Sequence, residues 1–208
     1  MKEQIAKHLL EIEAVLLQPD NPFTWVSGIR SPIYCDNRLT LSYPAVREEI
    51  EQGLCALIQE SYPACEMLMG TATAGIAHAA IVADRLKLPM GYVRASKKQH
   101  GRRNQIEGRV TPGQKIVVVE DLISTATSAI EVVDALRDVG CEVLGIASIF
   151  SYELKRAMQN LEEADCRNVS LCDYPTLVEV AVAQGAVDPK SIEKLAAWRR
   201  DPEGWLCQ

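Results

Sequence analysis

Short apolar runs alternate with helical patterns through the middle of the chain. Strands are predicted at residues 66–69, 90–94, 115–120, 142–150 and 168–172, with helices at 76–86, 127–139 and 154–161. The runs from Val117 to Val119 and from Ile146 to Ile149 are almost continuously apolar, which is typical of parallel strands that are covered on both faces. Alternating strands and helices predict an α/β fold, with a doubly wound, mostly parallel sheet and right-handed crossovers.

The N-terminal part of the chain has a different pattern. Apolar residues at helical spacing predict a first helix over residues 3–17, which the proline-rich turn at 19–22 would end. A second amphipathic helix is predicted at 44–60, and the segment between the two helices is rich in turns. We therefore expect residues 1–62 to form N-terminal helices and a small hood, 63–175 the α/β core, and 176–208 C-terminal helices that pack on the core.

One segment breaks the alternation of strands and helices. Residues 95–110 form a long polar stretch between two predicted strands, and long loops in compact domains are usually functional lids or disordered. The stretch is also the one dense basic cluster of the chain, with Glu107 as its only acid; its basic residues are Lys97, Lys98, His100, Arg102, Arg103 and Arg109. Composition alone favours a solvated, partly disordered loop.

Overall charge and composition narrow the functional classes. The formal charge of −6 argues against a broad nucleic-acid-binding face. Seven cysteines without a Cys-x-x-Cys pair predict reduced thiols rather than a disulfide framework or a zinc site. The charged first ten residues do not resemble a signal peptide, and no apolar run approaches the length of a membrane span. We expect a cytoplasmic protein of essentially one domain, without membrane or nucleic-acid partners.

The strongest candidate site follows the strand at 115–120. This strand ends in Glu120 and Asp121, and a turn rich in hydroxyl groups then opens a helix at Thr127. Free N–H groups at a helix N-terminus, together with Ser and Thr hydroxyls, favour a phosphate group. The neighbouring carboxylates can accept hydrogen bonds from the vicinal hydroxyls of a sugar. The alternative is an ordinary helix cap beside two solvated acids.

The run from Val117 to Ser128 resembles the phosphoribosyl-pyrophosphate signature of type I phosphoribosyltransferases. In that family two acids contact the ribose diol and the following turn binds the 5-phosphate. The resemblance therefore implies that phosphoribosyl pyrophosphate binds at Glu120, Asp121, Leu122, Ile123, Ser124, Thr125, Ala126, Thr127 and Ser128. The family usually has glycine where this chain has Ala126, and a left-handed alanine there would cost about 1 kcal/mol.

Three further segments extend this resemblance. The small-residue loop from Gly70 to Gly75, which alone would suit any βα turn, resembles the loop beside the pyrophosphate, so Thr71 and Ala72 join the expected substrate site. The basic stretch resembles the mobile catalytic loop of orotate phosphoribosyltransferases, here expected at 95–109. Residues 23–38 resemble their N-terminal hood, although Trp25 and Tyr34 are also compatible with simple packing.

What this resemblance implies is an orotate phosphoribosyltransferase that forms orotidine 5′-phosphate and pyrophosphate. Arg94, Lys98 and His100 would be its catalytic residues and would contact the pyrophosphate. Ser27, Gly28, Tyr34 and Ser124 would bind orotate. The cofactor would be Mg²⁺, carried by the pyrophosphate without a direct protein ligand. The partners would be the two small substrates and a second copy of the chain, forming a homodimer in which the basic loop completes the partner's active site.

The sequence leaves two alternatives open and excludes a third. Ala126, Ala95 and Val26 depart from the family pattern, since relatives commonly have lysine at the last two positions. A regulator that binds phosphoribosyl pyrophosphate without turnover is therefore one alternative, and a purine phosphoribosyltransferase is the other. A dinucleotide-binding module is excluded, because no Gly-x-Gly-x-x-Gly follows a predicted strand. His8 and His78 lie within helical patterns and are expected to be structural.

Overall fold

A six-stranded sheet forms the centre of the molecule in the computed structural model, which describes residues 1–25, 28–94 and 105–205. The strand order is β10-β9-β8-β5-β6-β7, and every neighbouring pair is parallel except the edge pair β6–β7. The strands are β5 (Met67–Thr71), β6 (Met90–Val93), β7 (Ile106–Glu107), β8 (Lys115–Ile123), β9 (Glu142–Ser151) and β10 (Asn168–Asp173). The expected doubly wound, mostly parallel sheet is confirmed.

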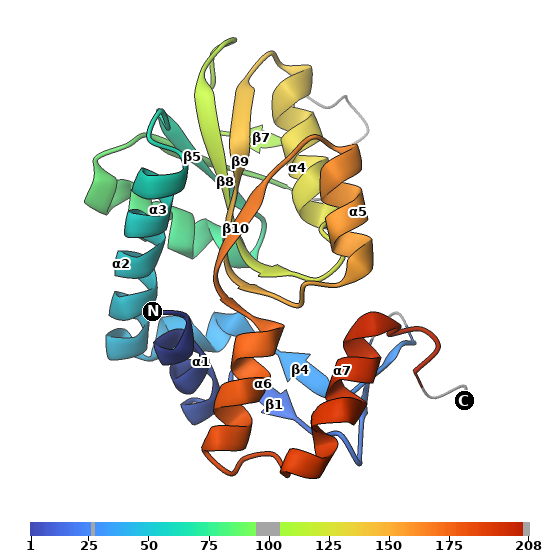
Figure 1. Ribbon diagram of the computed structural model, residues 1–208. Helices are drawn as coiled ribbons and strands as arrows, with labels where there is room; N and C mark the ends of the chain where they lie inside the picture. Colours follow the sequence, from blue (N-terminus) through green and yellow to red (C-terminus); the bar gives the residue numbers. More distant parts are fainter. Residues whose placement is uncertain (26–27, 95–104, 206–208) are drawn as a thin grey trace.

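Helices cover both faces of this sheet, which is why β8 is apolar along its length. The helices α2 (Pro44–Ser61) and α3 (Ala74–Leu86) lie on one side, and α4 (Thr127–Asp138) and α5 (Lys155–Glu163) on the other (Figure 1). Successive strand residues point to opposite faces. Val117 and Val119 accordingly pack into the core beneath α2 and α3, whereas Ile116 and Val118 pack beneath α4.

The N-terminal and C-terminal segments form a second layer beyond the carboxyl end of β10 (Figure 1). Its N-terminal elements are α1 (Lys2–Glu11), β1 (Val15–Leu17), β2 (Phe23–Thr24), β3 (Arg30–Ser31), β4 (Ile33–Cys35) and the 3-10 helix η1 (Asn37–Ser42). Its C-terminal elements are α6 (Tyr174–Ala183), η3 (Pro189–Ser191) and α7 (Ile192–Arg200). We call β2, β3 and the turn between them, residues 23–31, the hood hairpin.

The prediction of one helix over residues 3–17 is wrong. The helix ends at Glu11, and Glu13 has the left-handed φ of 56°, which no α-helix continues through. Residues Val15–Leu17 instead form β1, paired antiparallel with β4. Helical spacing of the apolar residues was misleading because Leu16 pairs with Tyr34 of β4, almost twenty residues away in the sequence.

The basic stretch also contains a strand that the sequence pattern did not indicate. Within the predicted loop, Ile106 and Glu107 form β7 and pair antiparallel with Val93 and Tyr92 of β6. The backbone N–H of Arg94 donates to the Gln105 carbonyl at 2.9 Å, which extends this pairing outward. Two residues are too few for a period-two pattern, so only the partner strand identifies them. Arg94 and Gln105 are therefore held side by side.

Two helices on the same face of the sheet are joined through buried polar groups. His78 on α3 and Glu51 on α2 are both fully buried, and the His78 Nδ1 atom lies 2.7 Å from Glu51 Oε1. The remaining polar atoms of the pair, Glu51 Oε2 and His78 Nε2, have no hydrogen-bond partner within the described residues. The structural role expected for His78 thus takes the form of a paired core histidine.

Within the described residues, no helix combines the length and the apolar character that crossing a bilayer would require.

Candidate active site

A pocket of about 270 Å³ lies at the carboxyl ends of β5 and β8, where ligands bind on open α/β sheets. Its wall is formed by residues 72–74 on one side and by 120–129 on the other. The structure therefore brings the small-residue loop together with the acid pair and the hydroxyl-rich turn, although these segments lie almost fifty residues apart in the sequence. Among the residues expected to bind phosphoribosyl pyrophosphate, Ala72 and all those from Glu120 to Ser128 line this pocket.

The turn after β8 presents the beginning of α4 to the pocket. The strand β8 continues past the acid pair to Ile123, and Leu122 near its end pairs with Phe150 on β9. Helix α4 then starts at Thr127 without a side-chain cap from Ala126, and Thr125 and Thr127 place their hydroxyl oxygens 3.0 Å from each other. Exposed N–H groups, the positive end of the helix dipole and two hydroxyls together suit a phosphate dianion.

Ala126 has a backbone conformation that favours glycine. Its φ of 64° lies in the left-handed region, where a Cβ atom crowds the backbone. The methyl group is nevertheless buried against the α4 side of the core, so it also contributes packing. The strain anticipated for this position is therefore present.

We expect Ala126→Gly to leave the free energy of unfolding unchanged or to raise it by up to about 1 kcal/mol, because relief of the strain offsets the lost methyl contact. The matched control is Ala135→Gly, since Ala135 is equally buried, at 5%, but lies in the interior of α4. That control should lower the unfolding free energy by about 1 kcal/mol or more. Urea denaturation measures both changes. Equal losses in the two variants would show that Ala126 is not strained.

Glu120 is the more buried member of the acid pair. Its side chain is 7% exposed, and its Oε1 atom accepts the backbone N–H of Asp121 at 2.9 Å. Burial, and secondarily the neighbouring Asp121, raise the pKa of Glu120 to about 8 from its ordinary 4.5. The pocket therefore holds a carboxyl group that can carry a proton near neutral pH.

This raised pKa makes stability depend on pH. The folded protein binds the Glu120 proton more tightly than the unfolded chain does, so this contribution to stability is complete below about pH 4.5 and is lost as pH rises toward 8. The unfolding free energy of the native protein should consequently fall, relative to that of Glu120→Gln, between pH 5 and pH 8. Urea titrations at both pH values measure the difference. A constant difference across this range would contradict the shifted pKa.

The small-residue loop is pressed against the end of β8. A Cβ atom on Gly75 would lie 2.3 Å from the Val119 carbonyl oxygen, so only glycine permits this approach. The Thr71 hydroxyl donates to that same oxygen at 3.3 Å, and the peptide bond between Ala72 and Thr73 is cis. The close approach of Gly75 and the Thr71 hydrogen bond hold the loop backbone beside the acid pair.

Arg94 lies in a small adjoining pocket, which it shares with Thr71, Ala72 and Ser128. Its guanidinium Nη2 atom is 3.1 Å from Glu107 Oε1 across the β6–β7 pair. Arg94 is thus the expected catalytic residue that the structure places next to the pocket wall. The other two, Lys98 and His100, lie outside the described residues, and so does the departure at Ala95.

The hood segment reaches the acid pair through a residue that sequence reasoning did not single out. The Asn37 amide, which is buried, donates to the backbone carbonyl of Asp121 at 2.7 Å. Its one sequence signal is its place near the end of residues 23–38, the segment that resembles the N-terminal hood. On the opposite side of the turn, the Asn160 amide from α5 donates to the Thr125 carbonyl at 2.8 Å. These two amides hold the last part of β8 and the turn that follows it.

The residues expected to bind orotate do not all lie at the main pocket. Gly28 has a φ of 87° in the turn of the hood hairpin, and the ring of Tyr34 on β4 packs 5.7 Å from that of Phe23. Ser124 lines the main pocket. Among the described residues, neither Gly28 nor Tyr34 contributes to the wall of that pocket. Ser27 and the departure at Val26 lie outside the described part of the chain.

Comparison with known proteins gives concordant similarities. The phosphoribosyl transferase domain family matches residues 48–190. An orotate phosphoribosyltransferase of Bacillus cereus is 60% identical over 208 residues, which cover 99% of each chain. The crystal structure of orotate phosphoribosyltransferase from Aeropyrum pernix has a TM-score of 0.76 at 30% identity, covering 88% of this chain and 99% of that one.

A third similarity concerns the fold alone. The orotate phosphoribosyltransferase of Mycobacterium tuberculosis in complex with phosphoribosyl pyrophosphate has a TM-score of 0.65 at 22% identity, covering 85% of this chain and 98% of that one. The sheet and the position of its carboxyl edge are thus shared by proteins whose sequences have diverged widely from this one.

Proposed function

Because the chain belongs to the orotate phosphoribosyltransferase family, we propose that it transfers ribose 5-phosphate from phosphoribosyl pyrophosphate to orotate. The products are orotidine 5′-phosphate and pyrophosphate, in de novo synthesis of the pyrimidine nucleotide UMP. The observation that carries this proposal is the pocket in which the acid pair, the hydroxyl-rich turn and the start of α4 meet the small-residue loop. A related enzyme has been crystallised with phosphoribosyl pyrophosphate, which supports the same substrate here.

In this pocket the phosphoribosyl group lies across the end of β8. The carboxyl groups of Glu120 and Asp121 accept hydrogen bonds from the ribose hydroxyls, and ionised Glu120 is the better acceptor of the two protonation forms. The 5-phosphate binds to the hydroxyls and backbone N–H groups of residues 124–128, at the N-terminus of α4. This arrangement leaves the anomeric carbon and the diphosphate on the side of Thr71 and Ala72.

The chemistry needs charge stabilisation rather than a protein nucleophile. The bond between the anomeric carbon and the diphosphate oxygen breaks and positive charge develops on the sugar. A ring nitrogen of orotate loses its proton and forms the new bond from the opposite face. Arg94, Lys98 and His100 stabilise the negative charge that develops on the departing diphosphate. His100 also donates a proton to it. Excluding water from the pocket protects the reactive sugar from hydrolysis.

Mg²⁺ is the proposed cofactor, and the chemistry of the pocket suits it. The ion commonly binds through substrate phosphate oxygens and water, and the described residues contain no cluster of three or more His, Cys, Asp or Glu that would hold it without the substrate. We assign the metal to the pyrophosphate group of the substrate, without a dedicated protein ligand. When bound, it neutralises charge on the diphosphate and so makes that group easier to displace.

Orotate is proposed to lie between the turn after β8 and the hood. Ser124 contacts it from the turn, while Ser27, Gly28 and Tyr34 contact it from the hood and β4. The tie between the Asn37 amide and the Asp121 carbonyl supports this arrangement, because it keeps the hood segment close to the sugar site. Residues 1–62 thus supply the cover of the base, residues 63–175 the phosphoribosyl site, and residues 176–208 the C-terminal helices.

The proposed assembly is a cytoplasmic homodimer. Residues 95–109 act as a catalytic loop that reaches into the active site of the partner. The pairing of Arg94 with Gln105 supports a defined base for such a loop. Sedimentation equilibrium tests the dimer, since the mass in solution should be about twice the 23.0 kDa of one chain. A monomer that retains full activity would exclude a loop acting in the partner's site.

The decisive test of the function is the loss of orotate ultraviolet absorbance when phosphoribosyl pyrophosphate is added, with and without Mg²⁺. Orotate should react, whereas adenine, hypoxanthine and xanthine should not, and omission of the metal should abolish the reaction. Turnover of a purine base would favour the purine enzyme. Binding of phosphoribosyl pyrophosphate without turnover of any base would favour the regulator.

A further inference from the structure

The helix α7 packs against the hood hairpin through one tryptophan. Trp198 is fully buried, and its indole N–H donates to the backbone carbonyl of Arg30 on β3 at 3.2 Å. The edge of its ring also meets Trp25, on the other side of the hairpin, with the ring centroids 5.7 Å apart and the planes at 81°. A single side chain from the C-terminal part of the chain thus contacts both arms of the hairpin.

The same cluster continues to the carboxyl end of the central sheet. Trp25 stacks on Tyr152, with centroids 5.4 Å apart and the planes at 29°, and Tyr152 packs edge-on against Trp198 at 5.7 Å. Tyr152 directly follows β9, and its backbone N–H donates to the Ile123 carbonyl at 3.0 Å. Ile123 precedes Ser124 of the hydroxyl-rich turn. Rigid aromatic contacts therefore connect the hood hairpin with the turn that is proposed to bind the 5-phosphate.

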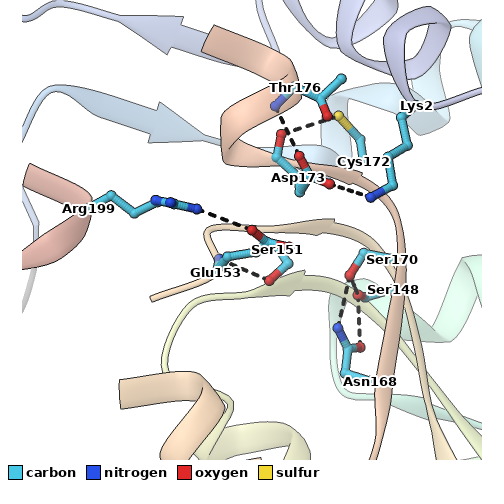
Figure 2. A network of polar contacts seen from close by, with 10 residues as sticks. All are labelled: Lys2, Ser148, Ser151, Glu153, Asn168, Ser170, Cys172, Asp173, Thr176 and Arg199. Atoms are coloured by element: carbon cyan, nitrogen blue, oxygen red, sulfur yellow. Dashed lines mark hydrogen bonds and ion pairs between the residues drawn. The ribbon is translucent and has the colours of Figure 1, made fainter. Parts of the chain in front are cut away.

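Helix α7 is itself held against the end of β9 and the start of α6. The Arg199 guanidinium lies 3.2 Å from the Glu153 carboxylate, and the backbone N–H of Glu153 donates to the Ser151 hydroxyl oxygen at 3.1 Å (Figure 2). The Tyr174 hydroxyl donates to the Leu195 carbonyl at 3.2 Å. Arg199 is partly exposed, so its ion pair is weak, but the buried aromatic contacts and the two attachments together fix the orientation of α7.

We propose that Trp198 is a positioning residue for the base, acting through the Arg30 carbonyl and the Trp25 ring to set the distance between the hood hairpin and the hydroxyl-rich turn. The inference rests on the proposed function, because orotate is the ligand assigned to the space between them. Trp198 contacts the hood and not the phosphoribosyl pocket, whose wall is formed by residues 72–74 and 120–129. Its loss therefore affects the base more than the sugar phosphate.

The test is Trp198→Phe, which keeps an aromatic ring but removes the N–H donor. We expect the KM for orotate to rise about fivefold or more, because the hood loses a hydrogen bond to a partly buried carbonyl. The KM for phosphoribosyl pyrophosphate and kcat should stay within about twofold of the native values. Amide hydrogen exchange should become faster in residues 28–34 and remain unchanged in residues 116–124.

Two matched variants separate positioning from a general loss of stability. Trp205→Phe removes a similar indole hydrogen bond, to the Lys194 carbonyl at 3.0 Å, beside the same helix. Tyr62→Phe removes bonds to the Ile146 and Arg167 carbonyls in the sheet, away from the hood. Both should leave the KM for orotate unchanged. A rise in either that equals the rise in Trp198→Phe would overturn the proposal.

The remaining outcomes also decide the inference. Equal increases in both KM values, or unchanged exchange in residues 28–34, would overturn the positioning role. If Trp198→Phe does not fold, Trp25→Phe alters the same ring contact from the hood side and should raise the KM for orotate and the exchange in the hood in the same selective way. A native protein that does not convert orotate would contradict the proposed function, while hydrogen exchange would still test the contact between α7 and the hood.

Discussion

Lys98→Ala should lower turnover at saturating substrate concentrations by about 100-fold, as removal of one charged donor does at comparable sites. The reason is electrostatic. The diphosphate gains charge as its bond to the sugar breaks, and the protein as a whole is acidic, with a formal charge of −6. Local cations must therefore stabilise the leaving group. Steady-state kinetics with both substrates in excess measures the effect.

Two further experiments supply a control and test whether the loop acts in the active site of the partner subunit. Lys190→Ala removes one positive charge from the exposed 3-10 helix η3 and should leave turnover unchanged. Mixing Lys98→Ala subunits with inactive Asp121→Asn subunits should restore about one quarter of native activity if the loop acts in the partner's site, since half of the dimers then contain one intact site. No recovery would place the loop in its own subunit, and unchanged turnover in Lys98→Ala would remove it from catalysis.

The largest expected loss of stability is for His78→Leu, which should lower the free energy of unfolding by about 3–5 kcal/mol. Glu51 and His78 are both completely buried and lie 2.7 Å apart. Leucine would leave the Glu51 carboxyl group in the core without its partner, and a buried polar group without a partner is costly. Urea unfolding followed by circular dichroism measures this loss.

A double variant shows whether the loss arises from the pair. Replacing both residues, in Glu51→Leu with His78→Leu, removes the unpartnered group and should recover most of the stability, because an apolar pair of similar volume is often as stable as a buried polar pair. A double variant that is less stable than His78→Leu alone would contradict this explanation. It would indicate that the cost comes from altered packing between α2 and α3 instead.

The central sheet was predictable because its signal is local. Strands such as β8 and β9 are covered on both faces, so they appear in the sequence as short, continuous apolar runs. The hydroxyl-rich turn was predictable for a related reason, since its acids, hydroxyls and helix start are consecutive. The order of these local signals was enough to indicate the fold and the edge of the sheet at which the pocket lies.

The rest depended on contacts between distant segments. β1 and β7 exist through pairing with β4 and β6, and their own residues carry too short a pattern to show it. Asn37 becomes part of the candidate site only because η1 lies beside β8. The raised pKa of Glu120 likewise requires burial of its side chain, and a Glu-Asp pair at a strand end does not by itself indicate such burial. Sequence thus identified the chemical groups better than their surroundings.

The aromatic cluster around α7 has a practical consequence for spectroscopy. The chain contains three tryptophans, and all three lie near this helix: Trp25 and Trp198 in the cluster, and Trp205 hydrogen-bonded to the Lys194 carbonyl. Tryptophan fluorescence therefore reports almost entirely on the layer formed by the N-terminal and C-terminal segments. The far-ultraviolet circular dichroism signal, in contrast, reports on the whole backbone. Comparing the two signals during denaturation would reveal, without any added label, whether this layer unfolds before the central sheet does.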